Sequence, residues 1–420
     1  MIKAGALLYA MFLVIVVTII SSSFILVNYY NSAYVIQALK QDQLYSDARS
    51  GIYYGLALYN ELPFNTPTTI DLFADEQHQV TLNKKTWGAF YVLTAQSKWK
   101  NKTAVKSALV GANINEGEKV ALYLADQNKP LSLTGRTNIQ GDCYLPQSGV
   151  KRAYIEGKSF VGNKLINGIR LHSNKSLPTI NQALLEECEK GFISRSTTQD
   201  SIVDYELVME QDSIINSFQH KTLVLYSPFS ITLSDKVIEG NIVILSDQQI
   251  KVASSAKVHN CLLYAKGIVL EESVEGNMQL FARDSICIKE NTRLKYPSVV
   301  ALIGQGNPVA AQKISIGEKV SIKGAVFLYN SHYDRKKQAL LTVGKESEIT
   351  GQLYSSELLE LKGKVVGGVY CKKMFLKTAS SVYENHLMDA VIDREALSEY
   401  FVGVPLTASV QHQRIIKWLN

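Results

Sequence analysis

The sequence predicts a mostly β fold, in which a right-handed parallel β-helix follows a long N-terminal transmembrane and stalk α-helix and a small β-sheet. Two observations predict this fold. From residue 229 a phrase of short aliphatic strands and polar turns recurs about every 18 residues, and residues 4–27 form an apolar run without a charge. A strand repeat of this length cannot bury a core alone, so we expect stacked coils.

The apolar run sets the expected location. A hydrocarbon core of about 30 Å needs roughly 20 helical residues, so residues 4–27 are long enough to span a bilayer. Only Lys3 and the α-amine precede the run, and the next basic residue is Lys40, which favours a cytoplasmic N-terminus. A cleaved signal peptide is the alternative, although its apolar region is usually about 7–15 residues long. We therefore expect a single-pass inner-membrane protein with its C-terminal bulk outside the cytoplasm.

The helix is expected to continue beyond the membrane. Apolar and small residues recur at steps of three to five up to Leu62, without an intervening proline, and Pro63 then ends the helix. Residues 1–62 are thus predicted to form a transmembrane helix and stalk. Residues 63–128 carry alternating strand signals, such as those around Val80 and Val92, and predict a small antiparallel β region.

The N-terminal region resembles a known family. It has a short polar start, a glycine, a long apolar helix and then the stretch DARSGIYYGLALY. This order resembles the N-terminal region of type IV pilin-like proteins, especially the minor PilX and GspK kinds. The resemblance implies that a prepilin peptidase cuts after Gly5, leaving Ala6 as the first residue, and that the apolar helix packs into a filament or pseudopilus. Ala10 stands where most major pilins have a glutamate. An ordinary membrane anchor remains the alternative.

The repeats predict the β-helix over residues 129–390. The first aliphatic residues of successive copies are Ile231, Ile250, Ile268, Ile286, Ile314, Leu341 and Leu359. Insertions within residues 304–312 and 330–338 lengthen two of the copies, and residues 131–145 look like an earlier copy. Glycines recur at one corner, which fits because tight corners often need a positive φ; they are Gly240, Gly276, Gly324, Gly351 and Gly367.

Handedness is inferred from strand length and from a second resemblance. The phrases ISIGEKVSIKGAV and LTVGKESEITGQL resemble the polymer-forming bactofilins, whose fold is a right-handed β-helix. Steps of six between Ile250 and Ile286 are the argument for the left-handed alternative. Residues 177–192 predict a helical insertion with Gly191 as its C-cap. Residues 391–420 are expected to cover the open end of the β-helix as a cap or tail.

The chain lacks the usual signatures of catalytic chemistry. A polysaccharide-cleaving β-helix needs clustered acids, and the candidates one or two periods apart are Glu271 with Glu290 and Asp247 with Asp284. The five cysteines show no CxxC pair, so we expect no metal and no cofactor. A bridge between Cys261 and Cys287 is geometrically conceivable. The lysines are scattered, which does not indicate a nucleic-acid surface.

These features together predict a non-enzymatic envelope protein. We expect a membrane-anchored pilin-like or secretion component whose β-helix is a scaffold for envelope or pilus proteins, with homo-oligomers as a further partner class. The alternative is a membrane-tethered β-helix enzyme acting on polysaccharide, and an acyltransferase would need a catalytic histidine, for which the one candidate is His332. The basic insertion at residues 330–338 is expected to be an interaction loop, formed by His332, Asp334, Arg335, Lys336 and Lys337.

Overall fold

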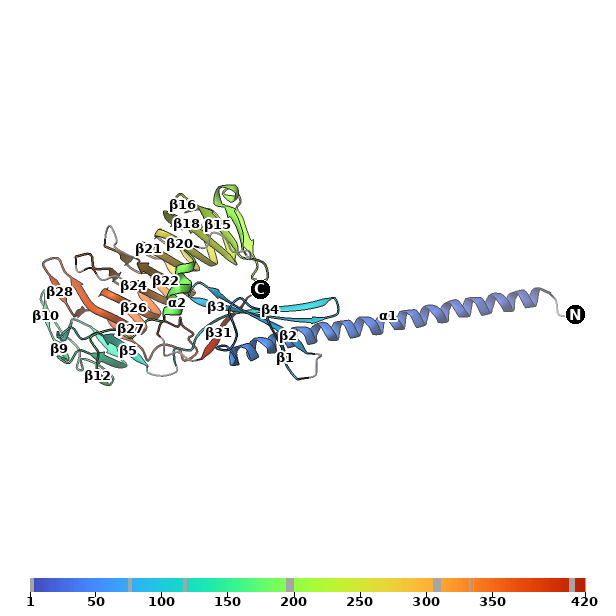
Figure 1. The fold of residues 1–420 in the computed structure, drawn as a ribbon, viewed down its shortest axis with the longest axis horizontal. Helices are drawn as coiled ribbons and strands as arrows, with labels where there is room; N and C mark the ends of the chain where they lie inside the picture. The colour runs from blue at the N-terminus through green and yellow to red at the C-terminus, as the bar shows by residue number, and fades with distance from the viewer. Residues whose placement is uncertain are drawn as a thin grey trace. The chain divides into compact units, whose positions relative to one another are not determined.

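The computed structural model describes residues 4–74, 78–115, 119–193, 200–304, 311–331, 334, 336–407 and 412–419. It divides into two compact units: Met1–Lys84 with Leu93–Ser107, and Lys85–Val92 with Ala108–Asn420. Figure 1 shows the long N-terminal helix and the many short strands that make up most of the chain. The fold class is confirmed, because the chain is mostly β, with one long apolar N-terminal helix and a solenoid of parallel strands. The right-handedness of the solenoid stays a prediction.

The first unit consists of a helix packed on a sheet. Helix α1 runs from Ala4 to Ala57, so it ends five residues before the predicted Leu62, which instead donates its N–H to Leu58 in a closing turn. The sheet has the order β1-β2-β3-β4-β31. Its strands are β1 (Thr68–Asp71), β2 (Gln79–Trp87), β3 (Phe90–Trp99), β4 (Lys102–Ala112) and β31 (Gln413–Leu419), of which β31 belongs to the second unit.

The last strand corrects one expectation from the sequence. Residues 391–420 were expected to cover the open end of the β-helix. Instead β30 (Val391–Asp393) pairs with β-helix strands, and β31 takes the edge position beside β4 in the small sheet. The β-helix is therefore an insertion between two neighbouring strands of that sheet, and the sequence could not show this because β31 lies about 300 residues from β4.

One face of the β-helix is a sheet of parallel strands that runs through the whole solenoid. Each strand between the first and the last of the row pairs with a neighbour on both sides. In spatial order its strands are β13 (Ser201–Asp204), β15 (Leu223–Ser227), β18 (Ile242–Ser246), β20 (Lys257–Leu270), β21 (Glu275–Ile288), β22 (Arg293–Gly304), β24 (Ser321–Asn330), β26 (Glu348–Leu361), β27 (Lys364–Lys377), β5 (Val120–Leu124), β8 (Asp142–Leu145) and β12 (Arg170–His172).

The remaining strands complete the other faces, apart from two short antiparallel pairs, Tyr154–Ile155 with Lys158–Ser159 and Val382–Glu384 with the end of β27. The long strands β20, β21, β26 and β27 bend around corners and contribute to more than one face. The additional strands are β6 (Leu131–Thr134), β7 (Asn138–Gln140), β9 (Val150–Arg152), β10 (Tyr154–Ile155), β11 (Lys158–Ser159), β14 (Ser213–Asn216), β16 (Ile231–Leu233), β17 (Val237–Gly240), β19 (Gln249–Val252), β23 (Lys313–Ile316), β25 (Leu340–Val343), β28 (Val382–Glu384) and β29 (His386–Met388).

The predicted repeat register is confirmed. The seven aliphatic residues that open successive copies are direct register partners, from Ile231 opposite Ile250 to Leu341 opposite Leu359, and all seven are buried. Their column continues to Met374 in the next coil. Stacking the same side-chain type coil upon coil makes the continuous aliphatic core that a short repeat cannot make alone.

The coils do not follow the order of the chain. Strand β5 pairs with β27 on one side and with β8 on the other, so the β-helix begins earlier along the chain than the expected residue 129. The coils formed by residues 120–172 thus stack beyond residues 364–377, and the repeats from residue 201 start at the opposite end. Helix α2 (Gln182–Lys190), capped by Asn181 and ending at the predicted Gly191, lies in the connection between the two groups of coils.

Candidate functional site

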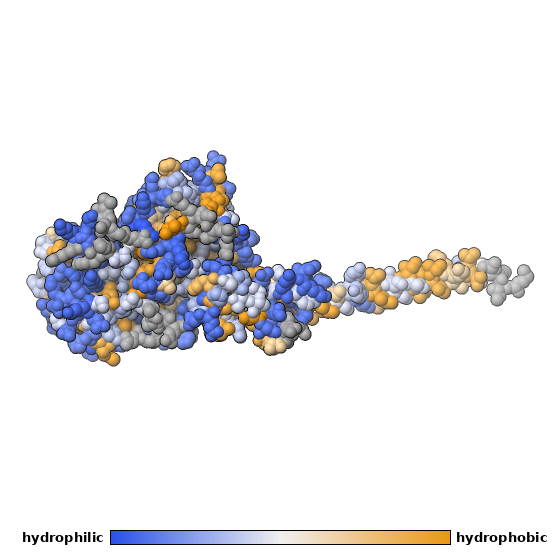
Figure 2. Space-filling model, viewed as in Figure 1, coloured by the Kyte–Doolittle hydropathy of each residue, from blue (hydrophilic) through white to orange (hydrophobic). Residues whose placement is uncertain are grey.

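The N-terminal part of α1 is an exposed apolar surface (Figure 2). Its most apolar 18-residue window, with a mean hydropathy of 2.7, is wholly unburied. Gly5 and Ala6 lie in the first turns of the helix and are exposed, and a Cβ at Gly5 would meet nothing within 4 Å. The predicted processing residues are therefore accessible at the start of a helix that is long and apolar enough to cross a membrane.

The C-terminal part of α1 packs on the sheet of its own unit. A Cβ at Gly51 would lie 2.6 Å from Cγ1 of Val80, and one at Gly55 would lie 2.9 Å from Cδ2 of Leu93. Glycines four residues apart share one helix face, so these two let the helix backbone approach the strands closely. Asp47 adds a polar contact to His78, with 3.1 Å between Oδ2 and Nδ1. The stretch that suggested the pilin resemblance therefore contains the helix–sheet contact.

The predicted interaction loop is anchored by a buried carboxylate. Glu357 accepts hydrogen bonds from Nδ2 of Asn330 at 3.0 Å and from the N–H of Ala339 at 2.5 Å, so it holds both ends of the insertion. Burial raises the pKa of Glu357 above its ordinary value. Within the loop, Asp334 accepts from the N–H of Lys336. Sequence reasoning missed Glu357, because it lies in the next coil, 18 residues beyond Ala339, and belongs to no recognisable motif.

The loop residues are only partly described. Lys336 is exposed, and Asp334 and Lys337 are half-buried. His332 and Arg335 lie outside the described residues, so their predicted roles in the loop stay predictions.

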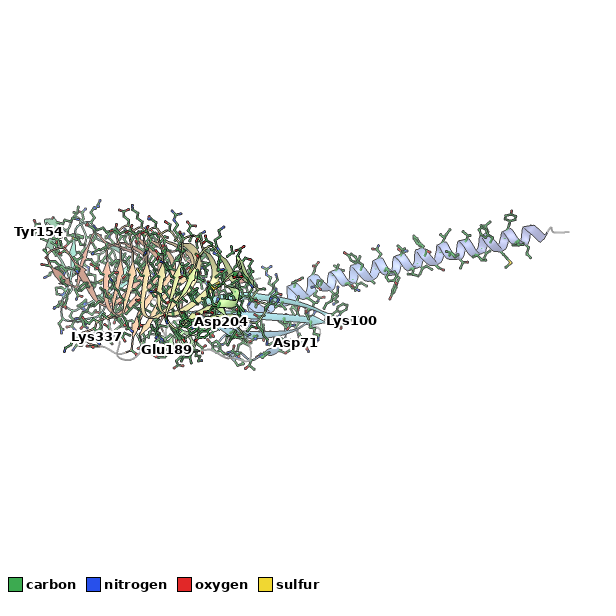
Figure 3. All side chains as sticks on the ribbon, turned by 90° about the horizontal axis from the view of Figure 1, so that it is seen from above. Asp71, Lys100, Tyr154, Glu189, Asp204 and Lys337 are labelled. Carbon is green, nitrogen blue, oxygen red and sulfur yellow. The ribbon has the colours of Figure 1, made fainter. Side chains whose placement is uncertain are left out.

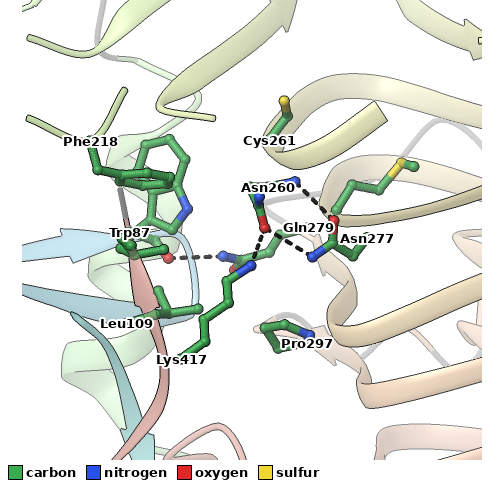
Figure 4. A pocket seen from close by; sticks show the side chains of 11 residues that line it. Trp87, Leu109, Phe218, Asn260, Cys261, Asn277, Gln279, Pro297 and Lys417 are labelled. Carbon is green, nitrogen blue, oxygen red and sulfur yellow. Dashed lines mark hydrogen bonds between the residues drawn. The ribbon is translucent and has the colours of Figure 1, made fainter. Parts of the chain in front are cut away.

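A small cavity in the second unit is a structural contact rather than a ligand site (Figure 4). Its volume is about 10 Å³, enough for one water at most. Gln279 donates to the carbonyl of Trp87 at 3.0 Å and accepts from the N–H of Ala89 at 2.8 Å, and Lys417 donates to Asn260. Because these polar groups bond one another, the cavity offers few free donors or acceptors to a ligand.

Glu271, one of the acids considered for catalysis, lies in an ion-pair cluster, and the cysteines considered for a bridge are free. Glu271 forms ion pairs with Lys251 at 2.9 Å and Lys289 at 2.5 Å, and hydrogen bonds from these lysines lower its pKa, which is unsuited to a general acid. Cys261 and Cys287 are both free, and Cys261 stacks on Met278 instead. Burial raises the pKa of Cys143 to about 12. Across the described ranges, no group of three or more His, Cys, Asp or Glu could hold a metal ion.

Comparisons with known proteins add little to this geometry. No family model matches the sequence, and no curated protein matches it. Among solved structures, a match is the crystal structure of the competence-associated pilin ComZ from Thermus thermophilus, with 8% sequence identity. The match covers 90% of this chain and 98% of that chain, at a TM-score of 0.25. A TM-score this low carries no argument about the fold or function of this chain.

Proposed function

We propose that this chain is a non-enzymatic, membrane-anchored subunit of a pilin-like or secretion assembly in the cell envelope. In this proposal α1 is embedded in the inner membrane or among the helices of a filament, and the β-helix is a scaffold outside the cytoplasm. The observation that carries the proposal is the unburied apolar surface of α1. Leu8, Phe12 and Phe24 are 71%, 65% and 68% exposed, and burying one such side chain is worth about 1.5–3 kcal/mol.

The length of α1 fits an anchor followed by a stalk. The helix has 54 residues, which is about 81 Å at 1.5 Å per residue, whereas the hydrocarbon core is about 30 Å thick. Tyr29, Tyr30 and Tyr34 follow the apolar run and are exposed. Tyrosine is enriched at membrane–water interfaces, so these rings fit the level at which α1 would leave the lipid.

The arrangement of the first unit supports the pilin-like part of the proposal. A long N-terminal helix packs its C-terminal part, through Gly51 and Gly55, on a sheet whose first two strands, β1 and β2, are antiparallel. This is the arrangement that the resemblance of residues 46–59 implies. Processing after Gly5 and packing of α1 beside other helices are the finer parts of the proposal.

Charges placed in the apolar run test the anchor. Asp at a helix centre costs about 2.5–3.5 kcal/mol for insertion into a membrane, so Val17→Asp with Ile20→Asp should cost about 5–7 kcal/mol. We expect this double variant to leave the membrane fraction, whereas the control Asn31→Asp with Ser32→Asp should remain there. Equal membrane retention of both double variants after carbonate extraction would contradict the anchor.

Processing is tested separately by mass spectrometry. Co-expression with a prepilin peptidase should shorten the chain by Met1 to Gly5, and Gly5→Leu should keep the full mass. A full-length mass for the parent chain, with and without an active peptidase, would leave a plain membrane anchor and refute the pilin-like part.

A further inference from the structure

The β-helix of the second unit has two unpaired strand edges in one sheet. Strand β13 pairs only with β15, and β12 pairs only with β8, so each leaves one edge without a strand among the described residues. Figure 3 places Asp204, the last residue of β13, and Tyr154 of the final coil toward opposite ends of the row of strands. An unpaired edge presents a row of free N–H and C=O groups, which is a template for another strand.

The two edges share one register. The column of core-facing residues in this sheet begins at Val203 opposite Leu225 and continues coil by coil to Leu122 and Cys143. It ends at Arg170, which is opposite Cys143 and is exposed. A parallel strand added beyond β12 would therefore continue the same sheet, and β13 of a second copy has the matching direction.

One edge is acidic. Residues 200–217, which we call the acidic edge, contain five Asp or Glu and no Lys or Arg. Asp204, Glu206 and Asp212 are exposed, and none has an ion-pair partner within the described part of the chain. Leu207 and Ile215 are 78% and 68% exposed on the same coil. The neighbouring cation, Lys236 of the next coil, donates to backbone carbonyls of the acidic edge.

The other edge is basic. Residues 150–175, which we call the basic edge, contain six Lys or Arg and one Glu. Lys151, Lys164 and Arg170 are exposed and have no ion-pair partner in the described ranges, although Lys158 pairs with Asp389 at 2.7 Å. Exposed apolar side chains accompany these charges here too, such as Ile169 at 62%.

We propose that the basic edge of one copy stacks on the acidic edge of a second copy, so that the parallel sheet continues from β12 into β13 of the neighbour. Neighbouring strands lie about 4.8 Å apart, and the Debye length is about 8 Å at physiological salt, so the opposite charges of stacked edges attract. Charges of one sign at both ends would keep copies apart. The partner is a second copy of this chain because one chain carries both complementary edges. This contact does not require α1, and the proposal goes beyond the anchoring role.

Repeated contacts of this kind are head-to-tail. Each copy uses a different surface from the one it meets, so the assembly is polar and can grow beyond two copies. The stacking must weaken as salt screens the charges.

Two charge-reversed variants test the proposal. Asp204→Lys, Glu206→Lys and Asp212→Lys make both edges basic, and Lys151→Glu, Lys164→Glu and Arg170→Glu make both edges acidic. The full chain, with one copy per lipid nanodisc, is examined by analytical ultracentrifugation at low and high salt. We expect the parent to associate at low salt, each variant alone to lose at least tenfold in affinity, and an equal mixture of the two variants to associate again.

The mixture also serves as the folding control, because misfolded variants would not restore each other. Lys266→Glu, Lys323→Glu and Lys345→Glu change the charge equally on exposed positions of middle coils and should associate as the parent does. A parent chain that stays single, variants that associate alone, or a mixture that does not associate would overturn the proposal. Failure to enter nanodiscs would instead contradict the anchor, and the same comparison in detergent micelles would still test the edges.

Discussion

The glycine corner of the β-helix gives the sharpest stability prediction. Gly351 has a φ of 134°, and a Cβ there would lie 1.9 Å from the carbonyl oxygen of Gly324 in the preceding coil. Gly367 repeats this geometry on Gly351. The contact is with backbone, so no side chain can move aside, and Gly351→Ala must shift one coil against its neighbour.

The matched control is Gly157→Ala. Gly157 also has a positive φ, of 80°, but a Cβ there would meet nothing within 4 Å. We expect this control to lower the free energy of unfolding by about 1 kcal/mol, because only the backbone conformation disfavours alanine there. In Gly351→Ala the alanine must adopt a sparsely populated φ, which costs about 1–3 kcal/mol, and its Cβ also overlaps the carbonyl oxygen. We therefore expect the free energy of unfolding to fall by at least about 3 kcal/mol.

Calorimetry of the detergent-solubilised chain measures the difference. The entropy of unfolding is about 2.1 cal/mol/K per residue, so for about 300 residues of the second unit 3 kcal/mol corresponds to a fall in melting temperature of about 5 °C. The control should fall by about 2 °C. Hydrogen exchange should rise at the coils on both sides of Gly351 in the variant. Equal shifts for the two variants would refute the argument, because the close approach of coils would then contribute nothing.

Three further predictions concern the core, the helix–sheet contact and the loop anchor. Leu353 is fully buried, so Leu353→Ala should lower the free energy of unfolding by about 2–5 kcal/mol. The control Tyr400→Ala, at a position that is 85% exposed, should lower it by less than about 0.5 kcal/mol. Comparable losses in denaturant melts would contradict the core assignment. Gly51→Val should destabilise the first unit by about 1–3 kcal/mol through overpacking, and Ser50→Val, on the exposed face, should not; protease resistance of the unit distinguishes them. The raised pKa of Glu357 means that the folded state binds the proton of this carboxyl more tightly than the unfolded state does. The stability from this group is therefore present below the ordinary pKa of 4.5 and is lost as the pH rises through the folded-state pKa. The melting temperature of Glu357→Gln should accordingly rise relative to that of the parent between pH 4 and pH 8, and a difference independent of pH would contradict the assignment.

The register of the β-helix was predictable from sequence because inward-facing positions must be aliphatic. Ile231 to Leu359 occur at the predicted steps, and the two long steps contain loops that leave the column intact. The close approach at the corner was predictable in the same way, since Gly240 and Gly324 sit where no Cβ fits. At Gly276 the reason differs from the prediction: its φ is not positive, but a Cβ would lie 2.4 Å from the carbonyl oxygen of Val258.

The order of the coils was not predictable. Every coil presents the same aliphatic column, so Leu122 can stack on Val369 as readily as on a coil that is adjacent in sequence. Periodicity along the chain carries no information about which coils meet in space. The buried polar contacts were missed for a related reason, because Gln279 and Trp87 are 192 residues apart and neither belongs to a recognisable motif.

We propose that α1 lies in the membrane while the β-helix lies outside the cytoplasm, and labelling of one residue tests this directly. Ser380 is exposed on the β-helix unit, and the native cysteines are buried apart from the half-buried Cys287. The direct measurement is labelling of Ser380→Cys by a membrane-impermeant maleimide in intact spheroplasts, with the parent chain as background. We expect full labelling without lysis, and labelling that appears only after lysis would contradict this orientation.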